Sequence, residues 1–143
     1  MRNILPLHDD VRREIGRIGR ADIVVGIPSY NNARTIGHVV RAVCAGLAKY
    51  FPDRRAILVN SDGGSGDGTP DAVGQAAIQE YRPLLTAHPL HPVHKIITPY
   101  HGLPGKGSAL RTVFAIAAEL DATACAVVDS DLRSITPEWL DLL

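Results

Sequence analysis

The sequence has little of several features that mark whole classes of protein. It contains two cysteines, equal numbers of basic and acidic residues, 15 of each, and no apolar run near the roughly 20 residues that cross a bilayer. Two cysteines are too few for a disulfide framework, and a balanced charge lacks the basic excess of nucleic-acid-binding proteins. The first ten residues turn acidic without an apolar core, unlike a secretory signal. We therefore expect a cytoplasmic protein with no membrane segment, no nucleic-acid partner, and two free, buried thiols at Cys44 and Cys125.

What the sequence does have is enough length for one domain with a substantial core, at 143 residues. Near its start, Val11, Ile15 and Ile18 recur at helical spacing. They predict a short amphipathic helix in an N-terminal extension, residues 1–20, that packs on a domain formed by residues 21–143.

The C-terminal residues have the pattern of a helix start. Thr136 fits an N-cap position, Pro137 fits the first helical position, and an acid follows in the first turn. The sequence stops about two turns later, and Trp139 and the leucines near it have little to pack against. These features predict that the domain is truncated inside a larger fold.

Strand and helix patterns alternate between residue 22 and the C-terminus. Apolar runs bounded by turn residues start near residues 22, 55, 93 and 124, and segments with helical spacing lie between them at about 33–50, 70–82 and 107–120. Asn31 or Asn32 is expected to cap the first of these helices. The alternation favours an α/β fold with a mostly parallel sheet. Right-handed crossovers and the common strand order 3-2-1-4 then predict a Rossmann-like three-layer sandwich.

The fourth apolar run ends in two acids. Residues 124–128 fit a strand buried on both faces of a parallel sheet, and Asp129-Ser130-Asp131 follows directly. Two carboxylates cannot be buried there without partners, because unpaired buried charge is very costly. Ligands bind at the carboxyl ends of strands in such sheets. We therefore expect Asp129 and Asp131 to hold a divalent cation and, through it, a phosphorylated ligand.

Polar or glycine-rich loops follow the first two strands and precede the third of these helices. Pro28-Ser29-Tyr30-Asn31 follows the first strand, and a loop with four glycines and the acids Asp62 and Asp67 follows the second. Lys106 lies between two glycines at a helix start, a place that suits a diphosphate, although the spacing is not that of a P-loop. In the predicted strand order the loops after the first, second and fourth strands meet in one crevice.

The segment 83–101 holds four of the six histidines, at 88, 91, 94 and 101. Pro89 and Pro92 interrupt any helix that would align them, and no cysteine or carboxylate lies among them. A solvated connector is therefore favoured over a zinc site, which needs a defined ligand set.

Four of these motifs together resemble the nucleotide-binding half of GT-A glycosyltransferases of the large family 2. The resemblance covers about residues 22–143, and within the group it is closest to the glucosyl-3-phosphoglycerate synthase and mannosylglycerate synthase type. The motifs that carry it are Ile27-Pro28-Ser29-Tyr30-Asn31, Asp62-Gly63-Gly64-Ser65-Gly66-Asp67-Gly68-Thr69, Gly105-Lys106-Gly107-Ser108-Ala109-Leu110, and Val127-Val128-Asp129-Ser130-Asp131 as the DXD motif.

The resemblance implies a site for a nucleotide-sugar. Its implied binding residues are Pro28, Ser29, Tyr30, Asn31, Asp62, Lys106, Asp129 and Ser130. Of these, Asp62 would accept a hydrogen bond from the base, and Lys106 would lie by the base or the phosphates. Asp129 would meet the ribose or the sugar, and Asp131, with Asp129, would ligate Mn²⁺ or Mg²⁺ on the diphosphate.

The expected function is therefore transfer of a sugar from a UDP-sugar, or alternatively a GDP-sugar, to a small-molecule or glycan acceptor. The acceptor half, which holds the general base in inverting relatives, lies outside this chain, so no catalytic residue is assigned. Homo-oligomer formation is left open. Two alternatives are a sugar-phosphate nucleotidyltransferase, which usually carries a basic glycine-rich loop after its first strand, and a truncated domain without catalysis.

Overall fold

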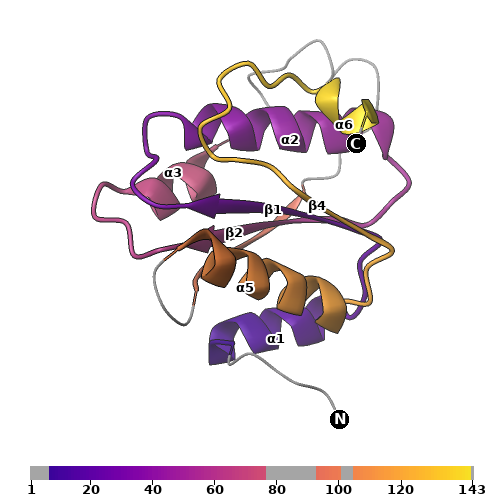
Figure 1. The fold of residues 1–143 in the computed structure, drawn as a ribbon. Helices are drawn as coiled ribbons and strands as arrows, with labels where there is room; N and C mark the ends of the chain where they lie inside the picture. Colours follow the sequence, from indigo (N-terminus) through magenta and orange to yellow (C-terminus); the bar gives the residue numbers. More distant parts are fainter. Residues whose placement is uncertain (1–6, 77–92, 101–104, 143) are drawn as a thin grey trace.

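The computed structural model describes residues 7–76, 93–100 and 105–142, and it shows a parallel sheet between two layers of helices (Figure 1). The strands are β1 Ile23–Ser29, β2 Ala56–Asp62, β3 His94–Pro99 and β4 Ala124–Val127. They form one sheet in the order β3-β2-β1-β4, and every neighbouring pair is parallel. The predicted α/β class, three-layer architecture and strand order are therefore confirmed.

In the part of the chain that the structure describes, five helices cover the two faces of the sheet. They are α1 Asp9–Ile18, α2 Ile36–Tyr50, α3 Thr69–Gln75, α5 Lys106–Glu119 and α6 Trp139–Leu142. In Figure 1, α2, α3 and α6 lie on one face, and α1 and α5 lie on the other. Because each connection between parallel strands crosses over one face of the sheet, successive helices can cover both sides.

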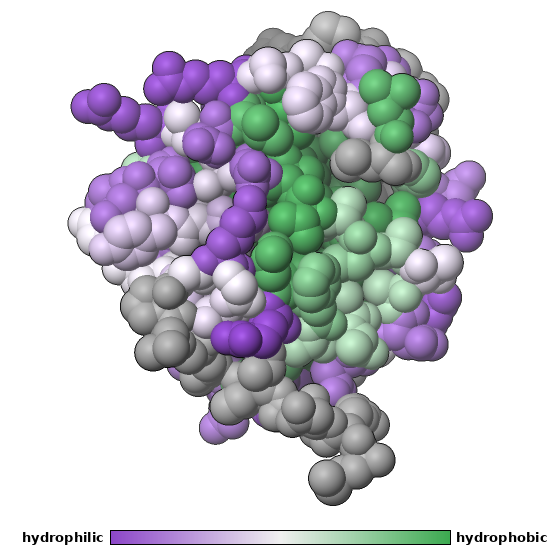
Figure 2. Space-filling view, in the orientation of Figure 1, coloured by the Kyte–Doolittle hydropathy of each residue, from purple (hydrophilic) through white to green (hydrophobic). Residues whose placement is uncertain are grey.

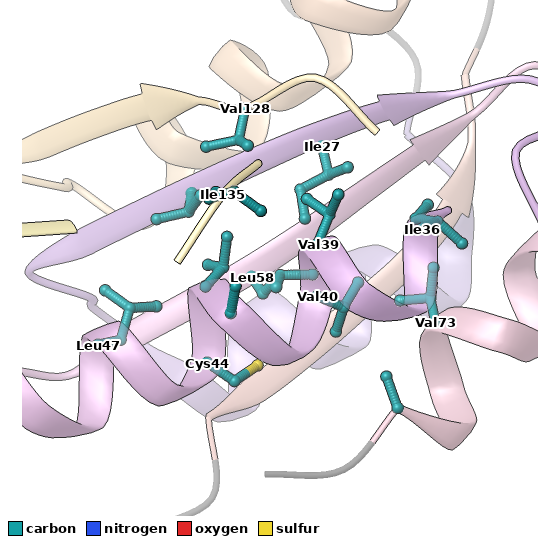
Figure 3. Packing of buried hydrophobic residues seen from close by; sticks show 14 of the residues in the cluster. Ile27, Ile36, Val39, Val40, Cys44, Leu47, Leu58, Val73, Val128 and Ile135 are labelled. Carbon is teal, nitrogen blue, oxygen red and sulfur yellow. The ribbon is translucent and has the colours of Figure 1, made fainter. Parts of the chain in front are cut away.

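Each face of the sheet has its own apolar cluster. On the α2 side, Val25, Ile27 and Leu58 of the strands pack against Val39, Val43 and Leu47 of the helix (Figure 3). On the α1 and α5 side, alternate strand residues such as Val24 and Val59 pack against Val113 and Ile116. The strands can therefore be apolar at successive positions, because neighbouring side chains enter different clusters.

The N-terminal helix matches its predicted pattern. Val11 and Ile15 of α1 are buried, and Ile18 packs against the same cluster as α5. Asp9 and Asp10 lie in the first turn of the helix, where negative charge is favourable.

The start of α2 corrects the predicted cap. The helix begins at Ile36 rather than near residue 33, and its N-cap is Thr35. Asn31 adopts a left-handed backbone conformation, with φ of 53°, and Asn32 precedes the cap. Neither asparagine caps the helix, because both side chains bond to other loops, as described below.

Burial of β4 was wrongly predicted. Ala124 and Cys125 are exposed, and Ala126 and Val127 are only partly buried. Within the described residues β4 pairs only with β1, so it is an edge strand with no neighbour on its outer side. Cys125 is accordingly an exposed free thiol, whereas Cys44 is buried as expected. Figure 2 shows apolar surface gathered across the middle of this view, where β4 lies in Figure 1.

The C-terminal segment packs better than its sequence indicated. A turn leads from Thr136 into α6, which begins at Trp139 instead of Pro137. Leu140 is buried against Gly46 of α2, so the expectation that this helix finds little to pack against is wrong for Leu140, whereas Leu142 is 84% exposed.

Two other predictions concern segments that lie partly outside the described residues. The helix expected over 70–82 is α3, which ends at Gln75 because Ala76 has an extended backbone, so the single long helix was wrongly predicted; positions 77–82 lie outside the described part. Of the four clustered histidines only His94 is described; it begins β3, and its Nε2 lies 3.6 Å from Glu14 Oε2. No helix among the described residues is long and apolar enough to cross a membrane.

Candidate functional site

The register of the sheet brings the carboxyl ends of three strands into one row. Ser29 of β1 pairs with Asp62 of β2, which pairs with Pro99 of β3. On the other side of β1, the chain beyond β4 stays alongside, because Val128 N donates to Gly26 O at 2.9 Å. The loops after all four strands therefore begin at the same edge of the sheet, where open α/β proteins bind ligands.

A cleft of about 650 Å³ opens at this edge. Its lining residues are Pro28, Ser29, Tyr30, Asn32, Gly63, Tyr100, Gly105, Lys106, Ala109, Asp129, Ser130 and Asp131. The cleft thus combines aromatic rings, the ammonium group of one lysine and two carboxylates with glycines that leave the backbone accessible.

A buried polar network forms the floor beside the cleft. Asn60 Nδ2 donates to Ile27 O at 3.0 Å and to Ser29 Oγ at 2.9 Å, and Ser29 Oγ donates to Asp62 Oδ1 at 2.8 Å. All three polar side chains are less than a tenth exposed. These bonds link the ends of β1 and β2 through buried side chains, although the buried Oδ1 of Asn60 has no hydrogen-bond partner among the described residues.

The Asp62 carboxylate also organises the glycine loop that follows it. Oδ2 accepts from the backbone N–H groups of Gly64 at 3.0 Å and Ser65 at 2.8 Å, and Oδ1 accepts from Ser65 Oγ at 2.6 Å. Together with the bond from Ser29, four donors from the chain itself reach this carboxylate. Its predicted bond to a base stays a prediction, and any such donor would share an oxygen with these partners.

The loops after β1 and β2 are tied together by side-chain bonds to the backbone. Asn31 Oδ1 accepts from Gly66 N at 2.9 Å, and Asn31 N donates to Ser65 Oγ at 2.8 Å. Asp67 accepts from Ala33 N at 3.1 Å and from the Thr69 hydroxyl, and the Thr69 bond is the main cause that lowers the pKa of Asp67. These contacts explain why neither loop needs regular secondary structure to be ordered.

The loop after β4 is joined to the loop after β1 by Asn32 and Ser130. Ser130 Oγ donates to Asn32 Oδ1 at 2.7 Å, and Ser130 O accepts from Thr35 Oγ at 2.8 Å. Ser130 is buried, so its hydroxyl holds the two loops in place. The neighbouring acids Asp129 and Asp131 remain on the cleft side.

An ion pair crosses the cleft between Lys106 and Asp129. Lys106 Nζ lies 2.8 Å from Asp129 Oδ1, and the two side chains are 61% and 48% exposed. The hydrogen bond to Asp129 raises the pKa of Lys106, and the charges of Asp129 and Asp131 add to that rise. Because water screens exposed pairs of this kind, a charged ligand can separate them at little cost.

The two acids fit a cation that a ligand helps to bind. Among residues 7–76, 93–100 and 105–142, no three His, Cys, Asp or Glu side chains form a metal-binding group. Asp129 and Asp131 nevertheless line the same cleft, and Asp131 is exposed. Mg²⁺ is usually held by one or two carboxylates together with substrate phosphates and water. The donor set therefore fits a cation shared with a diphosphate and does not fit a cage built from protein alone.

The predicted site residues fall in different places around the cleft. Seven of them line it: Pro28, Ser29, Tyr30, Lys106, Asp129, Ser130 and Asp131. Tyr30 is the most open of the large apolar side chains there, at 60% exposed. Asn31 and Asp62 do not line the cleft and instead hold the loops around it.

Sequence reasoning missed five residues of the lining, which are Asn32, Gly63, Tyr100, Gly105 and Ala109. Four of them, all except Tyr100, stand inside or beside motifs that were singled out, so their neighbours were the available signal. Tyr100 carried no signal, because it lies in the segment interpreted as a connector. Its place follows only from the register, since it comes directly after Pro99 in the row of strand ends.

A larger hollow of about 870 Å³ lies at the opposite, amino-terminal edge of the sheet, and no predicted site residue lines it. Arg20 and Arg55 line it, but both guanidinium groups already bond to other groups of the chain. Arg20 Nη1 lies 2.9 Å from Asp22 Oδ1, and Arg55 Nη1 donates to the carbonyl oxygens of Ile18 and Arg20. Two of the guanidinium groups in this hollow are therefore already bound within the chain, and Arg17, Asp53 and Arg54 also line it.

Fold and cleft together define the class of this protein. It is an α/β protein with a parallel sheet and a cleft at the carboxyl ends of its strands, which polar and charged side chains help to line. Comparison of the chain with protein-family models and with curated proteins gave no match.

Proposed function

We propose that this chain is the donor-binding part of a glycosyltransferase that uses a nucleoside diphosphate sugar together with Mn²⁺ or Mg²⁺. A UDP-sugar is the favoured donor, a GDP-sugar is the alternative, and the acceptor is a small molecule or a glycan. The observation that carries the proposal is the meeting of an aromatic ring, an ammonium group and two carboxylates in one cleft.

Each of these groups suits one part of such a donor. The exposed ring of Tyr30 offers a face on which a planar base can stack. The ammonium of Lys106 offers a point charge for a diphosphate at the start of α5, where backbone N–H groups also favour anions. Asp129 and Asp131 offer hard oxygen ligands for a divalent cation.

The same groups can promote departure of the nucleotide. Negative charge builds up on the diphosphate as the bond to the sugar breaks, and a divalent cation held by Asp131 and Asp129 supplies Lewis-acid stabilisation of that charge. Lys106, whose Nζ lies 2.8 Å from Asp129 Oδ1, would add a second positive charge near the diphosphate. The cation and Lys106 would share Asp129, so the ion pair opens when the donor binds.

Calorimetry tests the proposal directly. We expect the chain to bind UDP-glucose or GDP-mannose in the presence of Mn²⁺, with much weaker binding when a chelator removes the metal. Asp131→Asn should lower the affinity by about tenfold or more, because it removes a charged metal ligand.

The matched control is Asp53→Asn, which neutralises an exposed aspartate at the other edge of the sheet. This variant should bind like the unsubstituted chain. Absence of binding to both nucleotide-sugars, or binding that ignores the metal and Asp131→Asn alike, would count against the proposal.

A further inference from the structure

We propose that Tyr100 is a positioning residue of this cleft, which ties the turn carrying Lys106 to the loop that follows β2. Its effect on a ligand rests on the proposed function, because Lys106 is there assigned to the diphosphate. Its contacts within the chain do not depend on that assignment. Nothing in the motifs around Asp62 or Lys106 indicates this residue.

The register of the sheet places Tyr100 at the end of the row of strand ends. Ser29, Asp62 and Pro99 are paired across β1, β2 and β3, and the next residues are Tyr30, Gly63 and Tyr100. The sheet hydrogen bonding continues into this next row, because Gly63 N donates to Ser29 O at 2.9 Å and Tyr100 N donates to Asp62 O at 3.0 Å. The backbone of Tyr100 is therefore held by β2, although the residue follows the end of β3.

The ring of Tyr100 fills the space that a side chain at position 63 would need. A Cβ atom built on Gly63 would lie 2.7 Å from the Tyr100 hydroxyl oxygen and 3.1 Å from two ring carbons. Glycine at this position thus permits close approach of the ring to the backbone. Gly63 and Tyr100 fit each other as a pair, and a methyl group on Gly63 must push the hydroxyl away.

The hydroxyl of Tyr100 has a partner on the other side. Gly105 N donates to Tyr100 Oη at 3.0 Å. Gly105 is the N-cap of α5, has φ of 143°, and immediately precedes Lys106, the first helical residue. Because N–H groups at helix starts have no partner within the helix, this bond satisfies one of them and fixes the turn.

These two contacts fix the position of the turn from which the Lys106 side chain extends. The turn is held toward Gly63 by Tyr100, and from there Lys106 reaches across the cleft to Asp129 at 2.8 Å. Loss of the hydroxyl frees the Gly105 amide and lets the turn, and Lys106 with it, move away from the place where a diphosphate would bind. The base side of the cleft at Tyr30 is untouched, since it belongs to the loop after β1.

The test compares two ligands that differ only in the diphosphate. We expect Tyr100→Phe to weaken binding of UDP with Mn²⁺ by about fivefold, the usual effect of one neutral hydrogen bond, and to leave binding of uridine unchanged. Gly63→Ala should act in the same direction, and the double variant should be no weaker than the stronger single variant, because both substitutions act through one hydroxyl. Tyr50→Phe is the control, since Tyr50 ends α2 and does not line the cleft, and its hydroxyl bonds to Glu138 Oε2 at 3.3 Å.

A second measurement needs no ligand. Hydrogen exchange at the Gly105 amide should be faster in Tyr100→Phe than in the unsubstituted chain or in Tyr50→Phe. Unchanged exchange at Gly105, or equal weakening of UDP and uridine together with a lower melting temperature, would overturn the positioning role. So would UDP binding that is present but indifferent to Tyr100→Phe. Failure of the unsubstituted chain to bind UDP at all would instead contradict the proposed function.

Discussion

At the scale of single residues, the acids of the cleft edge divide by what their oxygens already contact. Asp62 is 4% exposed and receives hydrogen bonds from Ser29, Gly64 and Ser65. Among the described hydrogen bonds, Asp129 accepts only from Lys106 Nζ, and Asp131 is exposed. The first acid therefore builds the loop, whereas the other two are accessible to a ligand.

Replacement of Asp62 by alanine tests whether its carboxylate stabilises the loop that follows β2. The substitution leaves two backbone N–H groups and two hydroxyls without their acceptor, so we expect a loss of about 3 kcal/mol in the free energy of unfolding. Urea denaturation followed by circular dichroism measures this. Asp53→Ala, at an exposed position, should stay within about 0.5 kcal/mol of the unsubstituted chain. A loss below about 1 kcal/mol for Asp62→Ala would show that the network is dispensable.

The two cysteines offer a second residue-scale prediction. Burial raises the pKa of the Cys44 thiol to about 11, and the side chain is enclosed between α2 and the sheet. Cys125 is exposed on β4, although partial burial also raises the pKa of its thiol. Because the thiolate is the reactive form, alkylation should speed up as the pH rises toward the raised pKa.

Mass spectrometry after treatment of the native chain with iodoacetamide at pH 8.5 should find the label on Cys125 alone. Cys44 should react only after denaturant is added. Equal labelling of both thiols in the native state would mean that the α2 side of the core opens readily, contrary to the packing seen here.

At the scale of elements, the close fit of α5 against β1 depends on one glycine. A Cβ atom on Gly26 would lie 2.3 Å and 2.7 Å from the two Cγ atoms of Val113. Val113 is fully buried, so it cannot move into open space. The helix that begins at Lys106 is thus held close to the strand that leads to Tyr30.

Gly26→Ala should therefore destabilise the fold by about 2 kcal/mol, because added atoms in a filled core force strain or displacement. Gly16→Ala is the matched control: it lies within α1, and a Cβ atom there meets nothing within 4 Å. That substitution should stabilise the chain by about 0.5–1 kcal/mol, since alanine favours helices over glycine. Thermal unfolding of both variants should show shifts of opposite sign, and a shift of the same sign would contradict the packing argument.

The apolar pattern within the edge strand β4 did not predict its burial correctly. Its residues, Ala-Cys-Ala-Val, are apolar throughout, and that composition predicted burial on both faces. Burial also depends on which strands and helices lie next to the element. With β1 as its only partner among the described residues, β4 keeps two of its four residues exposed.

At the scale of the whole molecule, the cleft exists only because four strand ends meet. Under the proposed function, the two carboxylates that described residues contribute to the cleft would hold a cation together with a diphosphate. Metal and nucleotide should therefore bind as a linked pair rather than independently.

We expect Mn²⁺ alone to leave the melting temperature of the chain almost unchanged. UDP with Mn²⁺, at about 100 times the dissociation constant, should stabilise the folded chain by about 2.7 kcal/mol, through mass action on the folded state. Differential scanning calorimetry measures both effects. Asp131→Asn should abolish the contribution of the metal, and a large upward shift with Mn²⁺ alone would contradict the shared site.

The sequence by itself determined the order of the elements and the position of each polar loop. Apolar periodicity encodes strands and helices locally, so the α/β class followed from it. The strand order followed from right-handed crossovers and the common order of doubly wound sheets, and the seven cleft residues were named from the loop motifs and the family resemblance that these motifs carry. Only the tertiary structure decided which side chains face the cleft. Asp62 bonds to Ser29, 33 residues away, and Ser130 bonds to Asn32, 98 residues away. Tyr100 lies at the cleft because the register of β2 and β3 places the end of β3 there. Such partners are set by how the strands align and by which strand is an edge, and neither is encoded in the local pattern of residues.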